Sequence, residues 1–350
     1  MTDSSNLVVR PIQAHDLDGL LQLAGQTGGG MTTLKADRLQ LGERVATACA
    51  SFAEQLPPPQ RDYLFVMEDT GTAELVGVAA IKSAVGLDQP FYNYRMGALV
   101  HASAELGVFS TMETLYLSND LMGSAELCSL FLHPAYRNGY NGKLLSKSRL
   151  LFLAQFASLF PPRLIAELRG FLREDGSSPF WDHLGQHFFK MDFNRADELS
   201  SLGKKSFIAE LMPRYPLYVA CLPVEAQQVI GVVHDATAPA RRMLESEGLH
   251  YEGYLDIFDA GPVLQARIAA LRAVRESRLL PLTTSTTEAA STQVPLLIAS
   301  TSLQDFRVIC ASLPKAQDIA LSSAQQQLLR CESGDQLRVL PLNPRRHPNA

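Results

Sequence analysis

The sequence has few cysteines, and they follow no regular spacing. The five cysteines are Cys49, Cys128, Cys221, Cys310 and Cys331. An odd, scattered set without a Cys-x-x-Cys pair excludes a disulfide scaffold and a cysteine zinc site. It favours reduced thiols and therefore a cytoplasmic protein.

Long apolar runs and a basic charge excess are also absent. The most apolar stretch, residues 150–160, is too short to span a bilayer and is interrupted by Gln155 and Ser158. The N-terminus lacks the basic and apolar regions of a signal peptide. With 31 basic and 36 acidic residues, the formal net charge is −5, whereas nucleic-acid binding normally needs a basic surface. We therefore expect a soluble globular protein with no membrane or nucleic-acid partner.

The chain has 350 residues, of which 46% are hydrophobic, enough for one large or two modest domains. Periodicity in the first half predicts a mixed α/β order of β–α–α–β–β, two further strands, then a buried strand, a glycine turn, a helix and a strand. The predicted strands are residues 7–12, 63–67, 75–81, 94–101, 114–117, 126–133 and 164–168, and the predicted helices are 16–26, 36–56 and 143–160.

The second half is less regular. We predict helices at 179–188 and 239–247 and strands at 207–212 and 254–258. Segments beginning at Ser178 and Ala238 share a helix–glycine–strand order, so a second related lobe and a chance similarity both remain open.

The composition changes near the C-terminus. Residues 283–292 (TTSTTEAAST) are too polar to pack and predict a linker, and three β-type runs follow. The predicted domains are a body of 1–282, a linker of 283–292, and a small appended β segment of 293–350. Truncation near residue 282 is then expected to leave a folded body.

The strand–turn–helix at residues 126–160 is the most informative local feature. The N-terminus of a helix leaves backbone N–H groups unsatisfied and attracts phosphate oxygens. Gly139 and Gly142 allow a ligand to approach the backbone, and Arg137 or Lys143 adds positive charge. An ordinary structural turn explains the glycines as well.

This order resembles the GCN5-related N-acetyltransferase fold, a mixed sheet with flanking helices, in which the acyl-CoA pyrophosphate sits on a turn of pattern [Q/R]-x-x-G-x-[G/A]. Arg137 and Gly142 fit that pattern. Tyr140 stands where the middle glycine is expected, and Gly139 is displaced by one position.

Longer segments resemble the bacterial arginine N-succinyltransferase family over roughly residues 7 to 280. These segments are residues 27–34 (TGGGMTTL), 91–95, 99–103, 124–132 (SAELCSLFL), 141–149, 178–181, 207–213 and 254–262 (YLDIFDAGP).

The resemblance implies transfer of the succinyl group of succinyl-CoA to the α-amino group of L-arginine, the first step of an arginine catabolic pathway. It further implies direct transfer without a metal. Such enzymes occur as one gene product or as two paralogous subunits, and the C-terminal extension resembles the β-type subunit. An oligomer is therefore expected, and a paralogous α-type chain is one partner that the resemblance leaves open. The alternatives are an enzyme that uses ornithine, and a non-catalytic regulatory subunit.

Site residues follow from the same resemblance. His234, in a G-x-V-H segment, is implied as the proton donor, and Leu130 as a contact of succinyl-CoA through its backbone. A capping role for His234 remains open. His101, or a water held by Glu126, is the alternative for proton transfer.

Four further residues are weighed for substrate binding. Arg95 and Arg149 are candidates for carboxylate or phosphate binding, against an ordinary salt bridge. Asp256 and Asp259 are candidates for guanidinium binding, against a capped turn before Gly261.

Overall fold

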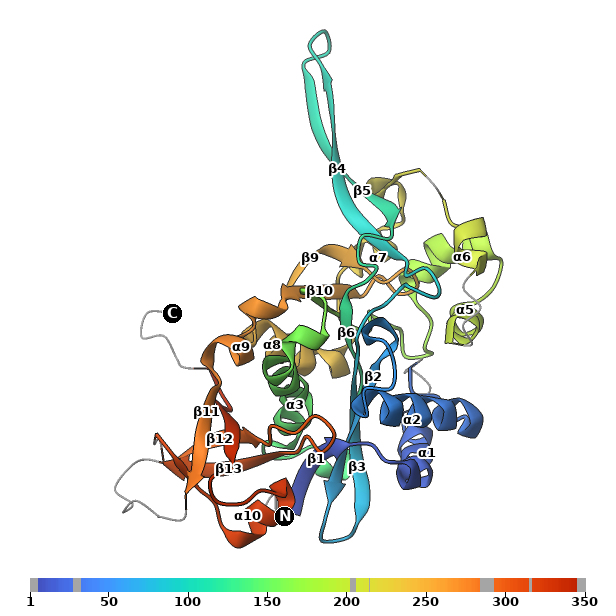
Figure 1. The fold of residues 1–350 in the computed structure, drawn as a ribbon. Coiled ribbons are helices and arrows are strands. Elements are labelled where there is room, and N and C mark those ends of the chain that lie inside the picture. The colour runs from blue at the N-terminus through green and yellow to red at the C-terminus, as the bar shows by residue number, and fades with distance from the viewer. Residues whose placement is uncertain are drawn as a thin grey trace. The chain divides into compact units, whose positions relative to one another are not determined.

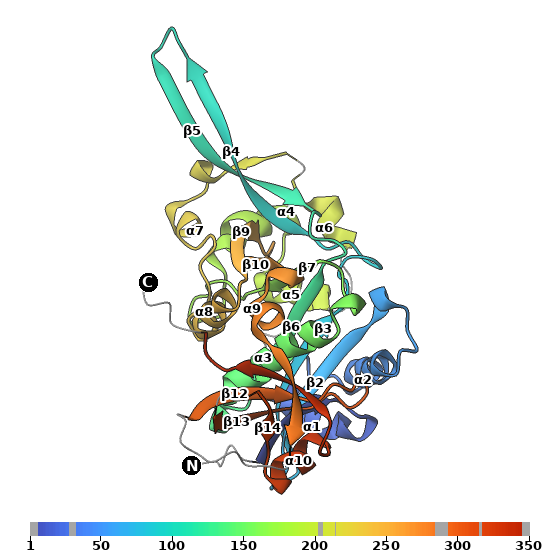
Figure 2. The same cartoon turned by 60° about the vertical axis from the view of Figure 1, so that its left-hand side comes forward.

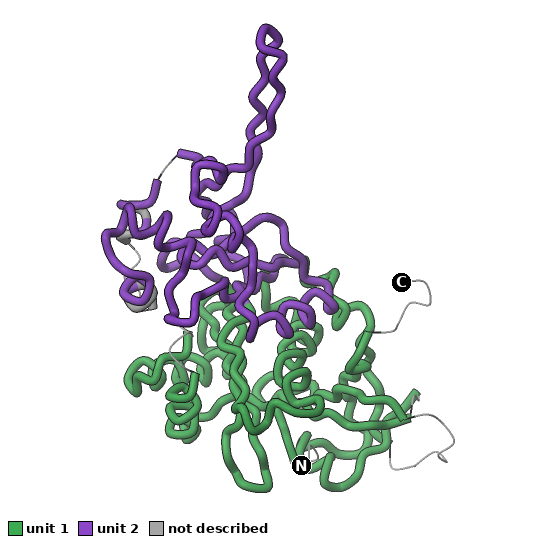
Figure 3. Tube along the Cα trace, turned by 180° about the vertical axis from the view of Figure 1, so that it is seen from behind, with its two compact units in different colours: residues 1–84, 127–162, 267–350 green, residues 85–126, 163–266 purple. Residues whose placement is uncertain are grey.

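A computed structural model describes residues 6–27, 33–201, 206–213, 215–283, 293–314 and 317–344. The chain forms two compact units (Figure 3). Unit 1 comprises Met1–Ala84, Leu127–Pro162 and Arg267–Ala350, and unit 2 comprises Val85–Glu126 and Arg163–Ala266. Within the described ranges, no helix is long and apolar enough to cross a membrane.

Unit 1 begins with the predicted β–α–α–β–β order (Figures 1 and 2). Its first elements are β1 (Leu7–Pro11), α1 (Leu17–Gly25), α2 (Arg38–Phe52), β2 (Asp62–Asp69), β3 (Glu74–Lys82), β6 (Ala125–Leu132) and α3 (Asn141–Gln155). The first two residues of β6 belong to unit 2. The mixed α/β class and this element order are confirmed.

The two faces of β2 pack into different apolar groups. Leu64 and Val66 belong to the core cluster that contains residues of α1 and α2. Phe65, between them, lies 5.1 Å from the ring of Phe152 on α3. This alternation is that of a strand buried on both sides, as its continuous apolar run suggests.

The C-terminal segment completes unit 1. Its elements are α9 (Arg272–Glu276), β11 (Arg278–Thr283), β12 (Gln293–Ala299), β13 (Val308–Pro314), β14 (Ile319–Ala320), α10 (Ser323–Leu329) and β15 (Gln336–Pro341). β13 pairs antiparallel with β1 at Val9↔Val308, and Val8 shares an apolar cluster with Ile298 and Ile309. The C-terminal strands are thus built into the same unit as the N-terminal strand.

Only one residue of the predicted linker 283–292 lies within the described part of the chain. Thr283 ends β11, and residues 284–292 lie outside the described part of the chain. The independence of residues 1–282 stays a prediction, which the pairing of β1 with β13 argues against.

Unit 2 holds paired strands with short helices around them. Its elements are β4 (Asn93–Ser103), β5 (Val108–Ser118), β7 (Arg163–Glu167), a π-helical turn Trp181–Gly185, α4 (Gln186–Phe189), α5 (Phe193–Ser201), α6 (Ser206–Leu211), β8 (Leu217–Tyr218), α7 (Val224–Gln228), α8 (Ala238–Ser246), β9 (His250–Leu255) and β10 (Pro262–Arg267). Trp181 anchors its core by stacking on Phe189 at 5.1 Å.

The hairpin of β4 and β5 projects from the rest of unit 2 (Figures 1 and 2). Each strand has 11 residues, and the pairing runs from Asn93↔Ser118 to Ser103↔Val108. Val100 and Phe109 on this hairpin are 58% and 76% exposed.

Two predicted strands differ in the structure. The strand predicted at 207–212 is wrong, because Ser206–Leu211 forms helix α6. Ile208 and Met212, four residues apart, are both buried, so the apolar run has helical spacing. The strand predicted at 254–258 overlaps β9 only at Tyr254 and Leu255. After Leu255, Asp256 caps a turn by accepting from the backbone N–H groups of Phe258 and Asp259.

Candidate active site

The glycine turn after β6 is braced from within. One turn of 3-10 helix, Pro134–Tyr136, follows β6. Asn141 is buried, and its Nδ2 donates to the Tyr136 carbonyl at 3.1 Å. Arg137 donates through Nε to the Leu132 carbonyl at 2.9 Å and lies over the Phe131 ring. Contacts within the chain therefore define the shape of the turn.

The N-terminus of α3 lacks a side-chain cap. The first bond into the helix runs from the Leu144 N–H to the Tyr140 carbonyl at 2.8 Å. The N–H groups of Gly142 and Lys143 have no acceptor among the described residues. Two adjacent free donors at the positive end of a 15-residue helix can bind an anion such as phosphate.

The two glycines of this turn differ in what the fold requires. Gly139 has φ +53°, a left-handed conformation that favours glycine. Gly142 has no such backbone need, and a Cβ there would meet only Leu132, at 4.0 Å. The fold therefore does not require a glycine at position 142. The missing side chain leaves room for a ligand to approach the backbone closely.

Strand β6 changes character near its middle. Leu130 is half-buried, whereas the other residues of the strand are buried. Ser129, directly before it, has φ +52°, which is rare for a residue other than glycine.

Glu126, at the start of β6, is only 6% exposed. No hydrogen bond or ion pair joins its carboxylate to the described residues. A carboxylate at the start of the strand with no protein partner among the described residues is a candidate base that would act through water.

His234 lies in unit 2, in the loop before α8. Its N–H donates to the Arg169 carbonyl at 2.9 Å, and its Nδ1 accepts from the Ala236 N–H at 3.1 Å. Because Nδ1 accepts, the neutral ring carries its proton on Nε2, and Nε2 has no partner among the described residues. His234 therefore presents a free N–H donor.

The capping role of His234 is also visible. His133 makes the same bond, with Nδ1 accepting from the Ala135 N–H at 3.2 Å. A histidine cap is thus used twice in this chain, and a test of His234 must separate capping from proton transfer.

The remaining sequence candidates have structural partners. Asp259 is buried, and its carboxylate accepts from the N–H groups of Gly170 and Gly261 at 2.7 and 2.8 Å, as the capped-turn interpretation predicts. Burial and the neighbouring Asp256 raise its pKa well above the usual range. Arg95 pairs with Asp120 at 3.1 Å, the salt-bridge alternative.

His101 lies on the exposed part of β4, where its Nε2 contacts the Tyr218 hydroxyl at 3.2 Å. Arg149 is buried in unit 1 and is not positioned at a surface site.

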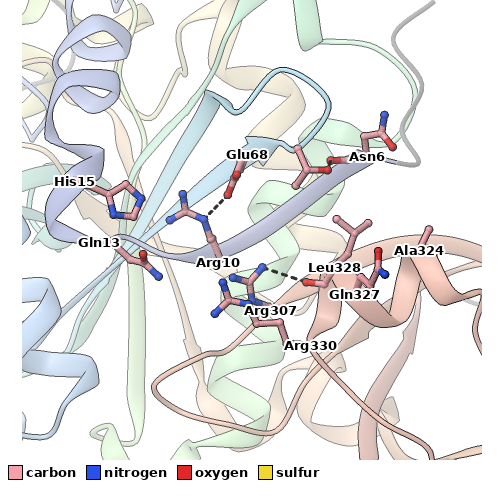
Figure 4. A pocket seen from close by; sticks show the side chains of 11 residues that line it. Asn6, Arg10, Gln13, His15, Glu68, Arg307, Ala324, Gln327, Leu328 and Arg330 are labelled. Atoms are coloured by element: carbon pink, nitrogen blue, oxygen red, sulfur yellow. Dashed lines mark hydrogen bonds and ion pairs between the residues drawn. The ribbon is translucent and has the colours of Figure 1, made fainter.

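A pocket of about 510 Å³ lies elsewhere in unit 1 (Figure 4). Its lining includes Arg10, Glu68, Arg307 and Arg330, and none of the residues predicted to act in the site. Arg10 pairs with Glu68 and Asp16, and both Arg307 and Arg330 pair with Asp305. These guanidinium groups are already neutralised by carboxylates, so the pocket is not an obvious anion site.

Some contacts near the candidate site could not be predicted from the sequence. Arg44 and Arg149 both reach the backbone or side chains around Ser129, and no motif indicates this. The sequence does indicate the uncapped N-terminus of α3, because Tyr140 occupies the position where Ser, Thr, Asp or Asn usually caps a helix. Within the described ranges, no group of three or more potential ligands could hold a metal ion. Residues 28–32 of the glycine-rich motif lie outside those ranges.

Comparison with known families covers nearly the whole chain. Residues 7–273 match the family "Arginine N-succinyltransferase beta subunit", and residues 278–341 match the C-terminal domain of the same subunit.

Individual relatives give the same result. The chain is 47% identical to the arginine N-succinyltransferase of Enterobacter sp. (strain 638), over 97% of this chain and 98% of the relative. It is also 47% identical to the enzyme of that name from Escherichia coli O139:H28, over 96% and 98%. The solved structure of arginine/ornithine succinyltransferase subunit AI from Pseudomonas aeruginosa superposes with a TM-score of 0.87. It shares 33% identity and covers 97% of this chain and 99% of its own.

Proposed function

Because the chain belongs to the arginine N-succinyltransferase family, we propose that it transfers the succinyl group of succinyl-CoA to the α-amino group of L-arginine. The observation that carries the proposal is the 47% identity to enzymes of that name over 97% of the chain. Formation of N2-succinyl-L-arginine in arginine catabolism is the role that this activity would serve.

The reaction sets clear chemical demands. The nitrogen lone pair of the neutral α-amine forms a C–N bond to the thioester carbon, and the carbonyl electron pair moves to oxygen. Collapse of this oxyanion breaks the C–S bond and releases CoA as a thiolate. The amine loses one proton to a base, and the thiolate gains one from an acid, so the products are the amide and CoA thiol.

In this proposal, residues of unit 1 bind succinyl-CoA. The free N–H groups at the start of α3 and the bare surface at Gly142 support phosphate binding. Gly139 shapes the turn, and Arg137 adds positive charge to it. Leu130 contacts succinyl-CoA through its backbone, where an N–H would stabilise the oxyanion.

Proton transfer uses His234 and, as the candidate base, Glu126. The free Nε2–H of His234 would donate to the departing thiolate. Complete proton transfer needs the imidazolium form, which requires the ring to give up its bond with Ala236. Glu126 is buried without a protein partner, which suits removal of a proton from the amine through water.

The proposal extends to the cellular location, the assembly and the substrate of the enzyme. A reducing, cytoplasmic location agrees with the free thiols of all five cysteines. An oligomer that includes a paralogous α-type subunit agrees with the subunit names of the matched family and the solved relative. Ornithine is the second candidate substrate, because the solved relative is named for both amino acids.

The purified single chain tests the activity. Thiol release from succinyl-CoA is measured with arginine, with ornithine and with neither, and the acylated product is identified by mass spectrometry. Arginine-dependent release by this chain alone is expected. Release that requires a second, different subunit would instead identify a regulatory or incomplete chain.

Variants of His234 separate its two roles. His234→Asn keeps an acceptor for the Ala236 N–H, because asparagine is a good N-cap, but it removes the imidazole. We expect kcat to fall by about 10²–10⁴-fold, the usual value of positioned proton transfer, with normal stability. His133→Asn is the matched variant for the same cap. Full activity of a folded His234→Asn enzyme would move the role to another group, and Glu126→Gln is the next variant to measure.

A further inference from the structure

Strand β6 contains an irregularity, and the side chains that it contributes to the apolar core show where it lies. In a regular strand, Cys128 and Phe131 point to opposite faces, because they are three residues apart. Both side chains nevertheless belong to the same apolar cluster, with residues of α1 and α2. One extra residue must therefore lie between them, and the left-handed Ser129, at φ +52°, marks the bulge.

Arg44 of α2 reaches this bulge from one face of the sheet. Its Nη1 donates to the Ser129 hydroxyl at 2.8 Å and also to the Thr33 carbonyl. Its Nε donates to the Asp62 carboxylate at 2.8 Å, and the Ser129 hydroxyl donates to Thr33 Oγ1 at 3.0 Å. Burial opposes the charge, but Asp62 and Cys128 outweigh burial and raise the pKa of Arg44.

Arg149 of α3 reaches the same point from the other face. Its Nη1 donates to the carbonyl of Cys128 at 3.2 Å and to that of Ala80 at 3.4 Å, and its Nη2 donates to the Ser146 hydroxyl at 3.0 Å. The Cys128 carbonyl is bonded directly to the nitrogen of Ser129. Arg149 thus holds the peptide unit that leads into the bulge.

Arg149 is unusual for a buried cation. It is 2% exposed, and no carboxylate among the described residues pairs with it. Burial lowers the pKa of Arg149 to about 10, so the side chain still carries its charge at neutral pH. An apolar residue of similar length would fill this place without burying a charge, so packing does not explain an arginine here.

We propose that Arg44 and Arg149 are positioning residues that hold the Ser129 bulge, and with it the backbone of Leu130, in the conformation needed for succinyl transfer. This inference rests on the proposed function, in which the Leu130 backbone contacts the thioester. Serine does not favour a left-handed conformation, so the surrounding side chains must impose it. Both arginines contact the bulge, and neither is assigned a contact with the reacting atoms.

Arg149→Met is the main test, because methionine removes the charge and the donors while filling similar space. We expect kcat to fall about 10- to 100-fold, with the KM for succinyl-CoA changed less than threefold, because the change misplaces the reacting carbonyl rather than the phosphates. Stability to urea is expected to be unchanged or higher, since a buried cation is removed. Arg149→Lys keeps the charge but not the fork of donors, and should lose kcat as well.

A second substitution distinguishes positioning from general structure. Glycine adopts the left-handed conformation without strain, so Ser129→Gly added to Arg149→Met should recover at least threefold in kcat. The single Ser129→Gly variant in the otherwise unchanged enzyme is the control. A general packing role predicts no such recovery and a loss of stability instead.

The wild-type reaction with arginine and ornithine is measured first. An inactive wild-type chain would remove the proposed function and this inference together. An active wild type with a folded Arg149→Met enzyme of normal kcat would overturn the inference alone. The same holds if kcat falls but Ser129→Gly fails to restore it.

Discussion

Phe306 provides a direct test of whether the C-terminal segment is part of the core. Its side chain is fully buried, and its ring lies 5.1 Å from that of Phe152, 5.9 Å from Phe156 and 6.2 Å from Phe65. Truncation of a buried phenylalanine to alanine typically costs about 3–5 kcal/mol. We therefore expect Phe306→Ala to lower the free energy of unfolding of unit 1 by about 4 kcal/mol, nearly a thousandfold in the equilibrium constant.

Urea denaturation with two signals measures this effect. Far-UV circular dichroism follows both units, whereas the fluorescence of the single tryptophan, Trp181, reports unit 2. Phe109→Ala is the matched control, since Phe109 is 76% exposed and its loss should change stability by less than about 0.5 kcal/mol. A destabilisation by Phe306→Ala below about 1 kcal/mol would refute the reasoning.

Truncation after residue 282 extends the same test. It removes Phe306 and also β13, the strand paired with β1. The composition predicts a folded body, but these contacts lead us to expect an insoluble or loosely packed fragment. A compact, cooperatively unfolding fragment of 1–282 would restore the appended-segment interpretation.

Two further predictions concern the glycine turn after β6 and the thiols. Gly142→Asp should raise the KM for succinyl-CoA at least tenfold, because it places a carboxylate against phosphate. Gly142→Ala, for which the structure has room, should bind succinyl-CoA nearly normally. Equal KM values for the Asp and Ala variants would show that the phosphates bind elsewhere. Burial raises the pKa of Cys310 and of Cys331 to about 11, so at pH 8 about one thiol in a thousand is ionised. The exposed Cys221 should therefore react first with a thiol reagent. Labelling of Cys310 and Cys331 should speed up about tenfold for each pH unit and level off only near pH 11. Fast labelling of all five cysteines at pH 8 would contradict the described packing.

The sequence predicted the first half of the fold well because its elements are long and periodic. The strand at residues 63–67 and the helix at 36–56 correspond to β2 and α2. The apolar run at 207–212 was mistaken for a strand because six residues are too few to distinguish the two periods. β10 (Pro262–Arg267) was missed because its strand begins at a proline.

The candidate site was only partly predictable. The glycine turn and the uncapped start of helix α3 follow from local sequence, and the family resemblance indicated Leu130 and His234. The bulge at Ser129 could not be predicted from local sequence, because its partners Arg44 and Arg149 lie 85 and 20 residues away along the chain. Such contacts depend on tertiary packing, which periodicity does not encode.

The division of unit 1 into three chain segments has a consequence for synthesis on the ribosome. Val9 pairs with Val308, so 299 residues must be added before the partner of β1 exists. At about 5–20 residues per second, that interval is roughly 15–60 seconds. Throughout it, one edge of β1 stays open to pairing with other nascent chains. Both segments of unit 2 are complete earlier, at residue 266. Nascent molecules would therefore depend on chaperones chiefly to protect the N-terminal strand, and slower elongation would lengthen that dependence.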